Sequence, residues 1–321
     1  MNSPQLFLPV SCASPSVPTT DDLLNAFAVF VHLDVANGDA SEDTVRGYFS
    51  QVQQYVEWCR DAGIDPATAT EDDIKRYRQH LVAQGYERGT IAHKLTVVRR
   101  FYAAAQDRGL RRDNPAAGVK PPRERSSDDD IPYLTEDELS RLLGAVPRDG
   151  KESSLRDLAL LAFLGLQARR QIEAHRANVE DIRSDGSMLV RGKYHDTVIQ
   201  LREDVRALFE EYIAKRGRVV PDDLGTPLFV AVGNRAGGKR LSRRGIRKVV
   251  DGYLEAAGLK RPGLSGHALR HSAATAAYAA TRDLRAVQDM LGHRNPRTTS
   301  RYAHIVHRRE NNPAAAIGIT L

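Results

Sequence analysis

Apolar side chains recur with the spacing of amphipathic helices over most of the chain. In the first third, four such runs fill residues 21 to about 112 and are joined by short segments. Capping residues precede the first three runs, at Thr20–Asp21, Ser41 and Thr70, and glycines close the last three, at Gly63, Gly85 and Gly109. The pattern predicts four helices of ordinary length in a compact bundle.

A proline-rich stretch separates this bundle from the rest of the chain. The text NPAAGVKPPRERSSDDDIP, residues 114–132, holds four prolines and a run of charges, which indicates a linker between domains. We therefore expect a flexible tail at 1–19, a first domain at 20–112, a linker at 113–131, a second domain at 132–310 and a second tail at 311–321.

The second domain is predicted to be mostly helical with one small sheet. Helical runs cover 134–146, where Thr135 is the expected N-cap, and 155–167. Apolar alternation on both sides of GKYHD, residues 192–196, predicts a β-hairpin over 187–201. Four more helical runs follow, at 202–217, 241–258, 265–280 and 284–293. The expected fold class is therefore mainly α (α+β), with a small antiparallel β-sheet.

Composition fits a globular protein of two domains. The chain has 321 residues, 41% of them hydrophobic and 27% charged, and no apolar run approaches the length of a membrane span. Its first twenty residues lack a basic leader and are interrupted by prolines, so we expect a tail rather than a signal peptide. Two cysteines make neither a disulfide framework nor a zinc site, which favours a cytoplasmic location without membrane attachment.

Charge is distributed unevenly along the chain. Residues 1–74 hold 2 Lys or Arg against 12 Asp or Glu, whereas residues 75–125 hold 13 against 4 and residues 233–309 hold 17 against 4. Two basic segments separated in sequence suit a protein that lays two surfaces on a polyanion such as nucleic acid. Solvated helix faces with surplus lysine and arginine would give the same count, so charge alone leaves both interpretations open.

Three short motifs in the second domain carry candidate chemistry: His267 with Arg270, then Leu291-Gly292-His293, then Tyr302. Residues three apart share a helix face, but each motif taken singly is common at protein surfaces. The spacing of His267 and His271 also suggests a metal site. The zinc-protease pattern needs Glu after its first His, where this chain has Ala268, so we expect His271 to be a packed, hydrogen-bonded residue.

Together and in this order, the three motifs resemble the tyrosine recombinase (phage-integrase) family, including its Xer-like site-specific recombinases. The resemblance runs from about residue 20 to 310, since DNPAAGVKPPR (113–123) is similar to the family's linker entry and the four preceding helices to its core-binding, SAM-like domain. It implies a protein that grips DNA as a C-shaped clamp.

The resemblance also implies a reaction. Tyr302 is the expected nucleophile, which attacks a DNA phosphodiester and forms a 3′-phosphotyrosyl bond. Arg270, His267 and His293 are expected to hydrogen-bond the phosphate oxygens as charge develops. In the family, a lysine on a β-hairpin protonates the leaving oxygen, and Lys193 stands at that place, beside Gly192, which would allow close approach to DNA. No metal or nucleotide cofactor is expected.

The family's second arginine lies in a Gly-Leu-Arg-x-x-Glu pattern ahead of the hairpin. Gly165-Leu166-Gln167 matches its start but puts glutamine at the arginine position. A shift of three residues makes Arg170 the arginine and Glu173 the carboxylate that orients it. Ala168 and Arg169 then replace Gly-Leu. We expect altered backbone geometry there, because alanine does not adopt positive φ cheaply, and we expect Arg169 to face DNA or an acidic partner.

Phosphate contacts are expected from basic residues on both domains. The candidates are Lys75, Arg76, Arg78, Lys94, Arg99 and Arg100 in the first domain and Arg243, Arg244 and Arg247 in the second. The implied partners are double-stranded DNA with paired recombination sites and three more copies of the chain, forming a tetramer on a Holliday junction and a monomer or dimer off DNA. Accessory proteins are a further possible partner.

Two other functions stay open on the sequence alone. The altered stretch around Arg170 would suit a catalytically impaired accessory or regulatory protein that binds DNA with the same fold. A type IB topoisomerase shares the chemistry but relaxes supercoils without partner sites. The length of the chain and its two-domain layout favour a site-specific recombinase, whether for integration, excision or dimer resolution.

Overall fold

The computed structural model describes residues 18–123, 132–192, 195–233, 236–292 and 295–310, with only the backbone of Arg297 and of residues 307–310. The chain divides into two compact units, Met1–Arg125 and Ser126–Leu321. Each unit has its own hydrophobic core, so each is described by itself.

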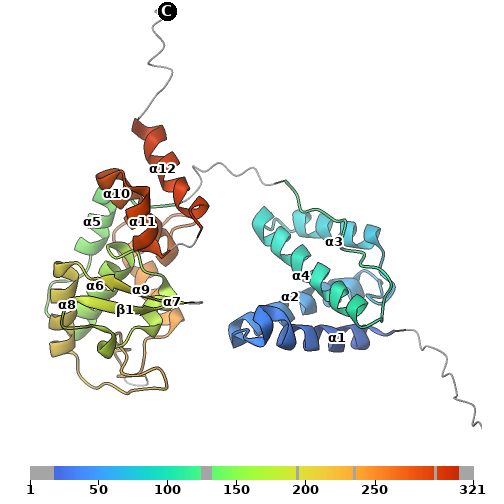
Figure 1. Ribbon diagram of the computed structural model, residues 1–321, viewed down its shortest axis with the longest axis horizontal. Helices are drawn as coiled ribbons and strands as arrows, with labels where there is room; N and C mark the ends of the chain where they lie inside the picture. Colours follow the sequence, from blue (N-terminus) through green and yellow to red (C-terminus); the bar gives the residue numbers. More distant parts are fainter. Residues whose placement is uncertain (1–17, 124–131, 193–194, 234–235, 293–294, 311–321) are drawn as a thin grey trace, which may run out of the picture. The chain divides into compact units, whose positions relative to one another are not determined.

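The N-terminal unit is a bundle of four α-helices (Figure 1). They are α1 Thr20–Leu33, α2 Glu42–Asp61, α3 Glu71–Ala83 and α4 Arg88–Asp107, with a short 3-10 turn at Val35–Gly38 after α1. Thr19 and Thr70 close capping boxes at the starts of α1 and α3, and Ser41 caps α2. The four helices predicted from the hydrophobic pattern are therefore confirmed, although the cap of α1 is Thr19 rather than Thr20.

Aromatic side chains fill the centre of this bundle. Phe27 on α1 contacts Phe101 on α4 edge to face, with ring centroids 5.8 Å apart. Two buried hydroxyls satisfy each other, because Tyr55 on α2 and Tyr102 on α4 lie within 2.7 Å oxygen to oxygen. The tyrosines thus bring large apolar area into the core without leaving a polar atom unpaired.

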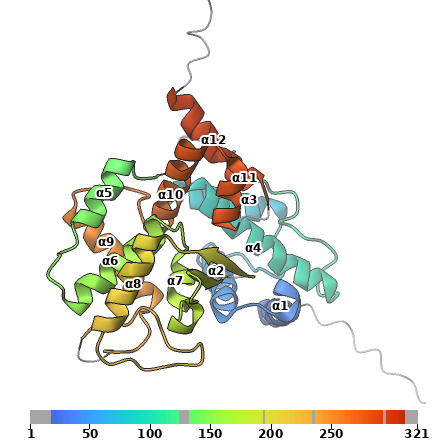
Figure 2. The ribbon, with the colours of Figure 1, turned by 60° about the vertical axis from the view of Figure 1, so that its left-hand side comes forward.

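The C-terminal unit holds the remaining helices and one hairpin. The helices are α5 Glu136–Gly144, α6 Glu152–Gly165, α7 Gln171–Arg176, α8 Glu203–Lys215, α9 Arg243–Ala256, α10 Gly266–Thr281, α11 Leu284–Leu291 and α12 Arg297–Glu310, with a 3-10 turn at Val179–Asp181. Helices α10, α11 and α12 lie together at one end of the unit (Figure 2). The mainly helical fold class with one small antiparallel sheet is confirmed.

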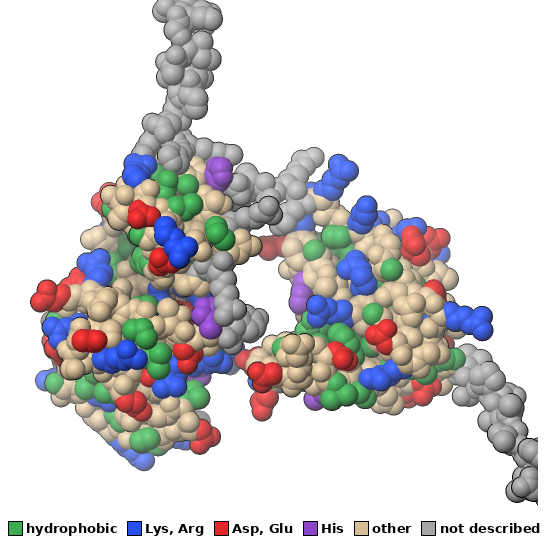
Figure 3. Space-filling model, viewed as in Figure 1, with side chains coloured by type: hydrophobic (Ala, Val, Ile, Leu, Met, Phe, Trp, Pro, Cys, Tyr) green, Lys and Arg blue, Asp and Glu red, His purple; other side chains and the backbone are tan. Residues whose placement is uncertain are grey.

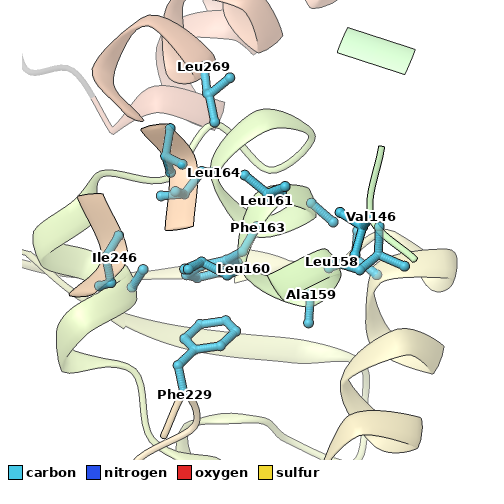
Figure 4. Packing of buried hydrophobic residues seen from close by; sticks show 14 of the residues in the cluster. Val146, Leu158, Ala159, Leu160, Leu161, Phe163, Leu164, Phe229, Ile246 and Leu269 are labelled. Atoms are coloured by element: carbon cyan, nitrogen blue, oxygen red, sulfur yellow. The ribbon is translucent and has the colours of Figure 1, made fainter. Parts of the chain in front are cut away.

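Helix α6 forms the centre of this unit. Every residue from Ser154 to Gly165 is buried, and a helix that is apolar on all sides belongs in a core. Its leucines and Phe163 pack against Phe229, Ile246 and Leu269 (Figure 4). Burial of one such side chain contributes about 1.5–3 kcal/mol. Glycine at the last position of α6, Gly165, leaves room for Leu139 of α5, because a Cβ there would stand 2.9 Å from that side chain.

The hairpin consists of β1 Ser187–Arg191 and β2 Asp196–Gln200, paired antiparallel from Ser187↔Gln200 to Arg191↔Asp196. Residues 193 and 194 at its turn lie outside the described residues. A Cβ on Gly192 would meet the carbonyl oxygen of His195 at 2.2 Å. Glycine is therefore required by the chain's own turn, a reason other than the close approach to DNA expected from the sequence.

Two helices of the C-terminal unit are not among the sequence predictions. Helix α7 is only six residues long, too short to show a clear helical period. Helix α12 begins at Arg297, after the last predicted helical run, which ended at residue 293. Both matter for function, since α7 begins directly after Arg170 and α12 carries Tyr302. Within the described parts of the chain, every helix is too short or too polar to cross a membrane.

Candidate active site in the C-terminal unit

Helix α10 supplies two of the candidate residues, His267 and Arg270, from its first turns. Ser265 caps the helix by accepting a hydrogen bond from the backbone N–H of His267. The next residue, Gly266, allows α7 to approach, because a Cβ on it would stand 2.2 Å from the Gln171 side chain. Because Gly266 has no side chain, Gln171 at the start of α7 can lie against the start of α10.

Arg270 is almost completely buried, with 1% of its surface exposed. Its guanidinium donates to the carbonyl oxygens of Ala168 and Leu291, each at 2.6 Å, and lies 3.8 Å from a carboxylate oxygen of Glu173. Burial, and next the neighbouring Arg170, lower the pKa of Arg270 to about 9. The group therefore stays charged at neutral pH.

Arg170 stands at the N-terminus of α7 and is held by Glu173. Its backbone N–H donates to one carboxylate oxygen at 2.9 Å and its guanidinium to the other at 2.6 Å. The Glu173 side chain is 3% exposed, whereas 36% of the Arg170 side chain is exposed. Glu173 therefore fixes one edge of a fork whose remaining donors are available to a ligand.

The carboxylate of Glu173 is shared by three arginines. Burial alone would raise the pKa of Glu173, but Arg169, the backbone N–H of Arg170, and Arg270 outweigh it and hold the pKa below its usual value. One negative charge thus stands among three positive ones. The surplus makes this part of the unit suited to an anion.

We predict a pH dependence of stability from Glu173. Because its folded pKa is depressed, Glu173 stabilises the native state above its unfolded pKa of about 4.3, and this contribution disappears as pH falls through the folded pKa. Glu173→Gln should lower the free energy of unfolding at pH 7, and its difference from wild type should shrink below about pH 4.

Urea denaturation between pH 7 and pH 3 measures this difference. Glu211→Gln, on an exposed position of α8, is the control and should follow wild type at every pH. A Glu173→Gln difference that does not change with pH would contradict the ion-pairing assigned here.

Ala168 adopts a left-handed backbone conformation with φ of 55° and is fully buried. The altered backbone geometry expected from the sequence is therefore not observed: alanine keeps a positive φ that glycine adopts more readily. Left-handed geometry costs an alanine about 1–2 kcal/mol. Its methyl group packs in a cluster with Tyr302, Leu291 and Val306, which offsets part of this cost.

Substitutions of Ala168 should show how far packing of its methyl group offsets the strain of its backbone. Ala168→Gly relieves the strain but loses a buried methyl worth about 0.8 kcal/mol and adds unfolded-state entropy, so the free energy of unfolding should change by less than about 1 kcal/mol. Ala168→Val should lower it by more than about 2 kcal/mol, because a β-branched residue fits positive φ poorly. Urea denaturation compares them, and a larger loss with glycine than with valine would contradict this account.

Arg169 has different partners from those expected. It is 3% exposed, and its guanidinium donates to the carbonyl oxygen of Gln167 at 2.6 Å and to that of Met290. The expectation that it faces DNA is wrong, and its direct hydrogen-bond partners are backbone carbonyls, with Glu173 acting as a nearby charge. A buried guanidinium needs such acceptors because an unpaired buried charge is very costly.

Tyr302 lies on α12 with 1% of its surface exposed. Its hydroxyl is 2.9 Å from Nδ1 of His271, whose ring in turn contacts that of His267 with centroids 4.6 Å apart. His271 is thus the packed, hydrogen-bonded residue predicted from the sequence, and its partner is the candidate nucleophile. Burial raises the pKa of Tyr302, and the positive charges of Arg270 and Arg301 oppose this rise.

The surroundings of His267 disfavour its charged form. The residue is exposed, but partial desolvation, followed by the charges of Arg270 and Arg170, lowers the pKa of His267 below its usual value. A neutral imidazole can donate from one nitrogen and accept at the other, which suits a group that moves a proton.

Two hollows meet at Arg170. One, of about 400 Å³, is lined by Arg170, His267 and Ser265 together with Arg243 and Arg247 of α9. The other, of about 180 Å³, is lined by Arg170, Arg169 and Glu173, by Gly192 of the hairpin and by Gly292 after α11. Lys193 and His293, the predicted catalytic residues that follow these two glycines, lie outside the described residues.

The predicted DNA-contacting residues differ in their surroundings. Arg243, Arg244 and Arg247 are exposed on α9, where Arg247 also pairs with Asp251, and Arg100 is exposed on α4, where it donates to the Tyr48 hydroxyl. Other side chains are bonded within the N-terminal unit: Lys75 to Glu71 and Asp72, Arg76 to Asp73, Arg78 to the Lys120 carbonyl, and Arg99 to the carbonyls of Ala116 and Val119. Lys and Arg side chains are interspersed with acidic ones on the visible face of each unit (Figure 3).

For Lys94 the expectation of a phosphate-facing side chain is wrong. The residue is 4% exposed, and its ammonium donates to the side-chain oxygens of Gln51 at 2.9 Å and Gln54 at 2.5 Å. The Tyr86 ring lies 5.0 Å from the same nitrogen. The position belongs to the face of α4 that packs on α2, so the lysine donates to amide oxygens of α2 instead of meeting solvent.

No cluster of three His, Cys, Asp or Glu side chains that could hold a metal ion occurs among the described residues.

Known proteins resemble this chain over most of its length. Residues 132–309 match the phage integrase family, and residues 33–109 match the phage integrase N-terminal SAM-like domain. A tyrosine recombinase XerD of Bifidobacterium longum is 32% identical over 282 residues, covering 86% of this chain and 90% of that protein. A tyrosine recombinase XerC of Pelotomaculum thermopropionicum is also 32% identical, over 78% of this chain and 81% of its own length.

Solved structures share the fold at low sequence identity. The XerH site-specific recombinase bound to a palindromic difH substrate matches with a TM-score of 0.70 at 18% identity, over 94% of this chain and 97% of that one. A lambda integrase tetramer bound to a Holliday junction matches with a TM-score of 0.71 at 16% identity, over 90% and 78%.

Proposed function

The chain belongs to the phage integrase family of tyrosine recombinases, and we propose that it breaks and rejoins DNA at specific sites through a 3′-phosphotyrosyl intermediate. The observation that carries this proposal is the convergence of Arg170, Arg270 and Tyr302. They come from three separate stretches of the sequence. Arg270 donates to the carbonyls of Ala168 and Leu291, which share a cluster with Tyr302, and the charges of both arginines oppose the rise that burial causes in the pKa of Tyr302. A nucleophile beside two guanidiniums is what attack on a phosphodiester requires.

The reaction can be written on these residues. The Tyr302 oxygen forms a bond to phosphorus while the bond from phosphorus to the 5′-oxygen breaks, and a 5′-hydroxyl leaves. Attack by a 5′-hydroxyl of another strand reverses the step, so no external energy source is consumed. Negative charge develops on the non-bridging oxygens, where Arg170 and Arg270 would donate paired hydrogen bonds.

We assign the proton transfers to the remaining candidate residues, which are His267, Lys193 and His293. His267, whose pKa is lowered by desolvation and by the nearby arginines, would accept the phenolic proton or donate to a phosphate oxygen. We assign Lys193 as the acid for the leaving 5′-oxygen and His293 as a further donor. In support, the residues before them, Gly192 and Gly292, line the same hollow as Arg170.

Burial of Tyr302 implies a change before attack. A side chain that is 1% exposed does not reach a DNA strand, so we infer that α12 shifts when DNA binds and that the hydroxyl leaves His271. Until then, the buried hydrogen bond keeps the nucleophile from solvent.

We further propose that both units contact one duplex, as a C-shaped clamp, and that four copies act on paired sites through a Holliday junction. Exposed arginines on α9, and Lys75, Arg76 and Arg100 on the N-terminal unit, would neutralise phosphates. Support comes from the shared fold with recombinases crystallised on DNA and, for lambda integrase, as a tetramer on a junction. The reaction would take place in the cytoplasm, where chromosomal and plasmid DNA are found.

The arginine surface predicts a salt effect. Arg247→Ala should weaken DNA binding by a similar factor on any sequence and should reduce the slope of log K against log salt by about 1, because one phosphate contact is lost. Fluorescence anisotropy at 50–200 mM salt measures the slope. Arg206→Ala, whose arginine pairs with Glu210 on α8, is the matched control. An unchanged slope for Arg247→Ala would remove α9 from the DNA-binding surface.

Covalent capture tests the proposed function. Genomic fragments from the source organism, nicked at random, are incubated with the protein in EDTA without ATP, treated with SDS and passed through a glass-fibre filter. We expect recovery of fragments that share one site, because a nick near the cleaved bond lets the short strand diffuse away and traps the adduct. DNA bound before SDS and released by it would instead indicate an accessory DNA-binding protein.

A further inference from the structure

Beside the candidate active site lies a buried arginine, Arg169, that no step of the proposed reaction uses. Arg169 is 3% exposed and lies next to the proposed catalytic Arg170 in the sequence. Its guanidinium joins two carbonyls far apart in the chain, those of Gln167 and Met290. Burial lowers the pKa of Arg169, and the charge of Glu173 opposes this shift. Burial of a charged guanidinium costs desolvation free energy, so we asked which contacts Arg169 maintains.

Arg169 and Arg270 bridge the same two segments. Arg169 links the carbonyl of Gln167 to that of Met290, and Arg270 links the next carbonyl in each segment, Ala168 to Leu291. The first segment is the turn between α6 and α7, which leads into Arg170. The second is the last turn of α11, which leads into Gly292. Two parallel guanidinium bridges therefore hold opposite sides of the smaller hollow together.

The last turn of α11 is a natural place for such bridges. The final carbonyls of a helix lack partners within the helix and carry the negative end of its dipole, so arginines there satisfy acceptors and charge at once. The two bridges differ in one respect. Arg270 is also needed at the phosphate in the proposed reaction, whereas Arg169 has no such task.

From these contacts we propose that Arg169 is a positioning residue for the cleavage reaction. It keeps the turn that carries Arg170 and the end of α11 at a fixed spacing when Arg270 turns its donors toward the phosphate. Ala168 fits this arrangement, because its left-handed backbone directs its carbonyl to Arg270 while Arg169 spans from Gln167 to α11. This inference rests on the proposed function for its catalytic consequence, but the bridge itself can be measured without activity.

Arg169→Met and Arg169→Lys separate positioning from general stability. Methionine fills similar space without charge, and Glu173 keeps Arg170 and Arg270 as partners, so the folded state should survive the loss of the two hydrogen bonds to carbonyls. Lysine keeps the charge but lacks the planar fork that spans two carbonyls. Arg216→Met is the matched control, because Arg216 also donates to two backbone carbonyls, those of Pro227 and Leu228, away from the hollow.

The first measurement is amide hydrogen exchange of the full-length protein without DNA. In both Arg169 variants, exchange at residues 284–292 should become at least about fivefold faster, while helices of the N-terminal unit should be unchanged. The control should not alter residues 284–292. Unchanged exchange in both Arg169 variants would overturn the proposal whatever the protein does to DNA.

The second measurement is the single-turnover rate of covalent adduct formation on the captured, nicked site. Arg169→Met should be about tenfold to a hundredfold slower than wild type, with Kd for the site within about twofold, and Arg169→Lys should recover only part of the loss. Cleavage by Arg169→Met at the wild-type rate would overturn the positioning role. Absence of adduct with wild type would reject the proposed function instead and leave the exchange result to decide whether the bridge exists.

Discussion

Tyr302→Phe should form no covalent protein–DNA adduct, while its affinity for the same DNA changes by less than about twofold. The variant lacks only the oxygen that attacks phosphorus, and its ring still fills the cluster of Leu291, Val306 and Ala168. The lost hydrogen bond to His271 should cost about 1 kcal/mol of stability, too little to unfold the unit. Gel electrophoresis in SDS with labelled, nicked DNA measures the adduct.

Tyr278→Phe is the matched control for this experiment. Tyr278 is a buried tyrosine of α10 in the same cluster, and its hydroxyl is given no role in attack. It should form adduct at a rate close to that of wild type. Adduct formation by Tyr302→Phe would mean that another residue is the nucleophile, and the assignment of α12 to the active site would be wrong.

Arg270→Ala should lose both activity and stability. Removal of one preorganised donor from a transition-state oxyanion typically slows a reaction by about 10²–10³-fold, and we expect that loss in adduct formation. Truncation also leaves the carbonyls of Ala168 and Leu291 without this donor, at about 1–3 kcal/mol for each buried group. The free energy of unfolding should therefore fall by about 2–4 kcal/mol, as measured by urea denaturation.

A second substitution separates the two effects of Arg270. Arg270→Lys retains a positive charge and part of the hydrogen bonding, so its stability should lie closer to that of wild type. Its adduct formation should remain strongly reduced, because an ammonium cannot bridge two carbonyls and also donate a fork to phosphate. A lysine variant with full activity would show that charge alone is needed at this position.

The helical pattern predicted the fold well where helices are long and periodic. The helices α1 to α6 and α8 to α11 correspond to predicted runs, because each has an apolar face and most start at a Thr or Ser cap. Helix α7 is short, and its first residue is set by the bond from Arg170 to Glu173 rather than by a hydrophobic pattern. Such local polar contacts leave little trace in periodicity.

The site shows where sequence reasoning stops. Counting from both sides placed Arg170 beside Glu173, and the structure shows the ion pair between them. The positive φ of Ala168 was not expected, because alanine adopts it only at a cost, yet the residue keeps a φ of 55°. The partners of Arg169 were not expected either, since carbonyl acceptors carry no sequence signal and Met290 is 121 residues away. The sequence alone does not distinguish a buried arginine that donates to backbone carbonyls from an arginine at the surface.

In the N-terminal unit, the burial of Lys94 was likewise not predictable from the sequence. A lysine in a basic helix is usually exposed, and the sequence placed this one with its charged neighbours. The structure turns it toward Gln51 and Gln54 of α2, two amides that the pattern gave no reason to connect with it. Burial of a lysine depends on acceptors brought by tertiary packing, which single-chain periodicity does not contain.

The most direct test of the central claim is to locate the covalent bond. Wild-type adduct is trimmed with nuclease and trypsin, and the peptide that retains nucleotide is sequenced by mass spectrometry. Of the 11 tyrosines in the chain, we predict modification at Tyr302 only, in the peptide YAHIVHR from 302 to 308. Nucleotide on any other residue, or SDS-stable DNA with Tyr302 unmodified, would contradict the account.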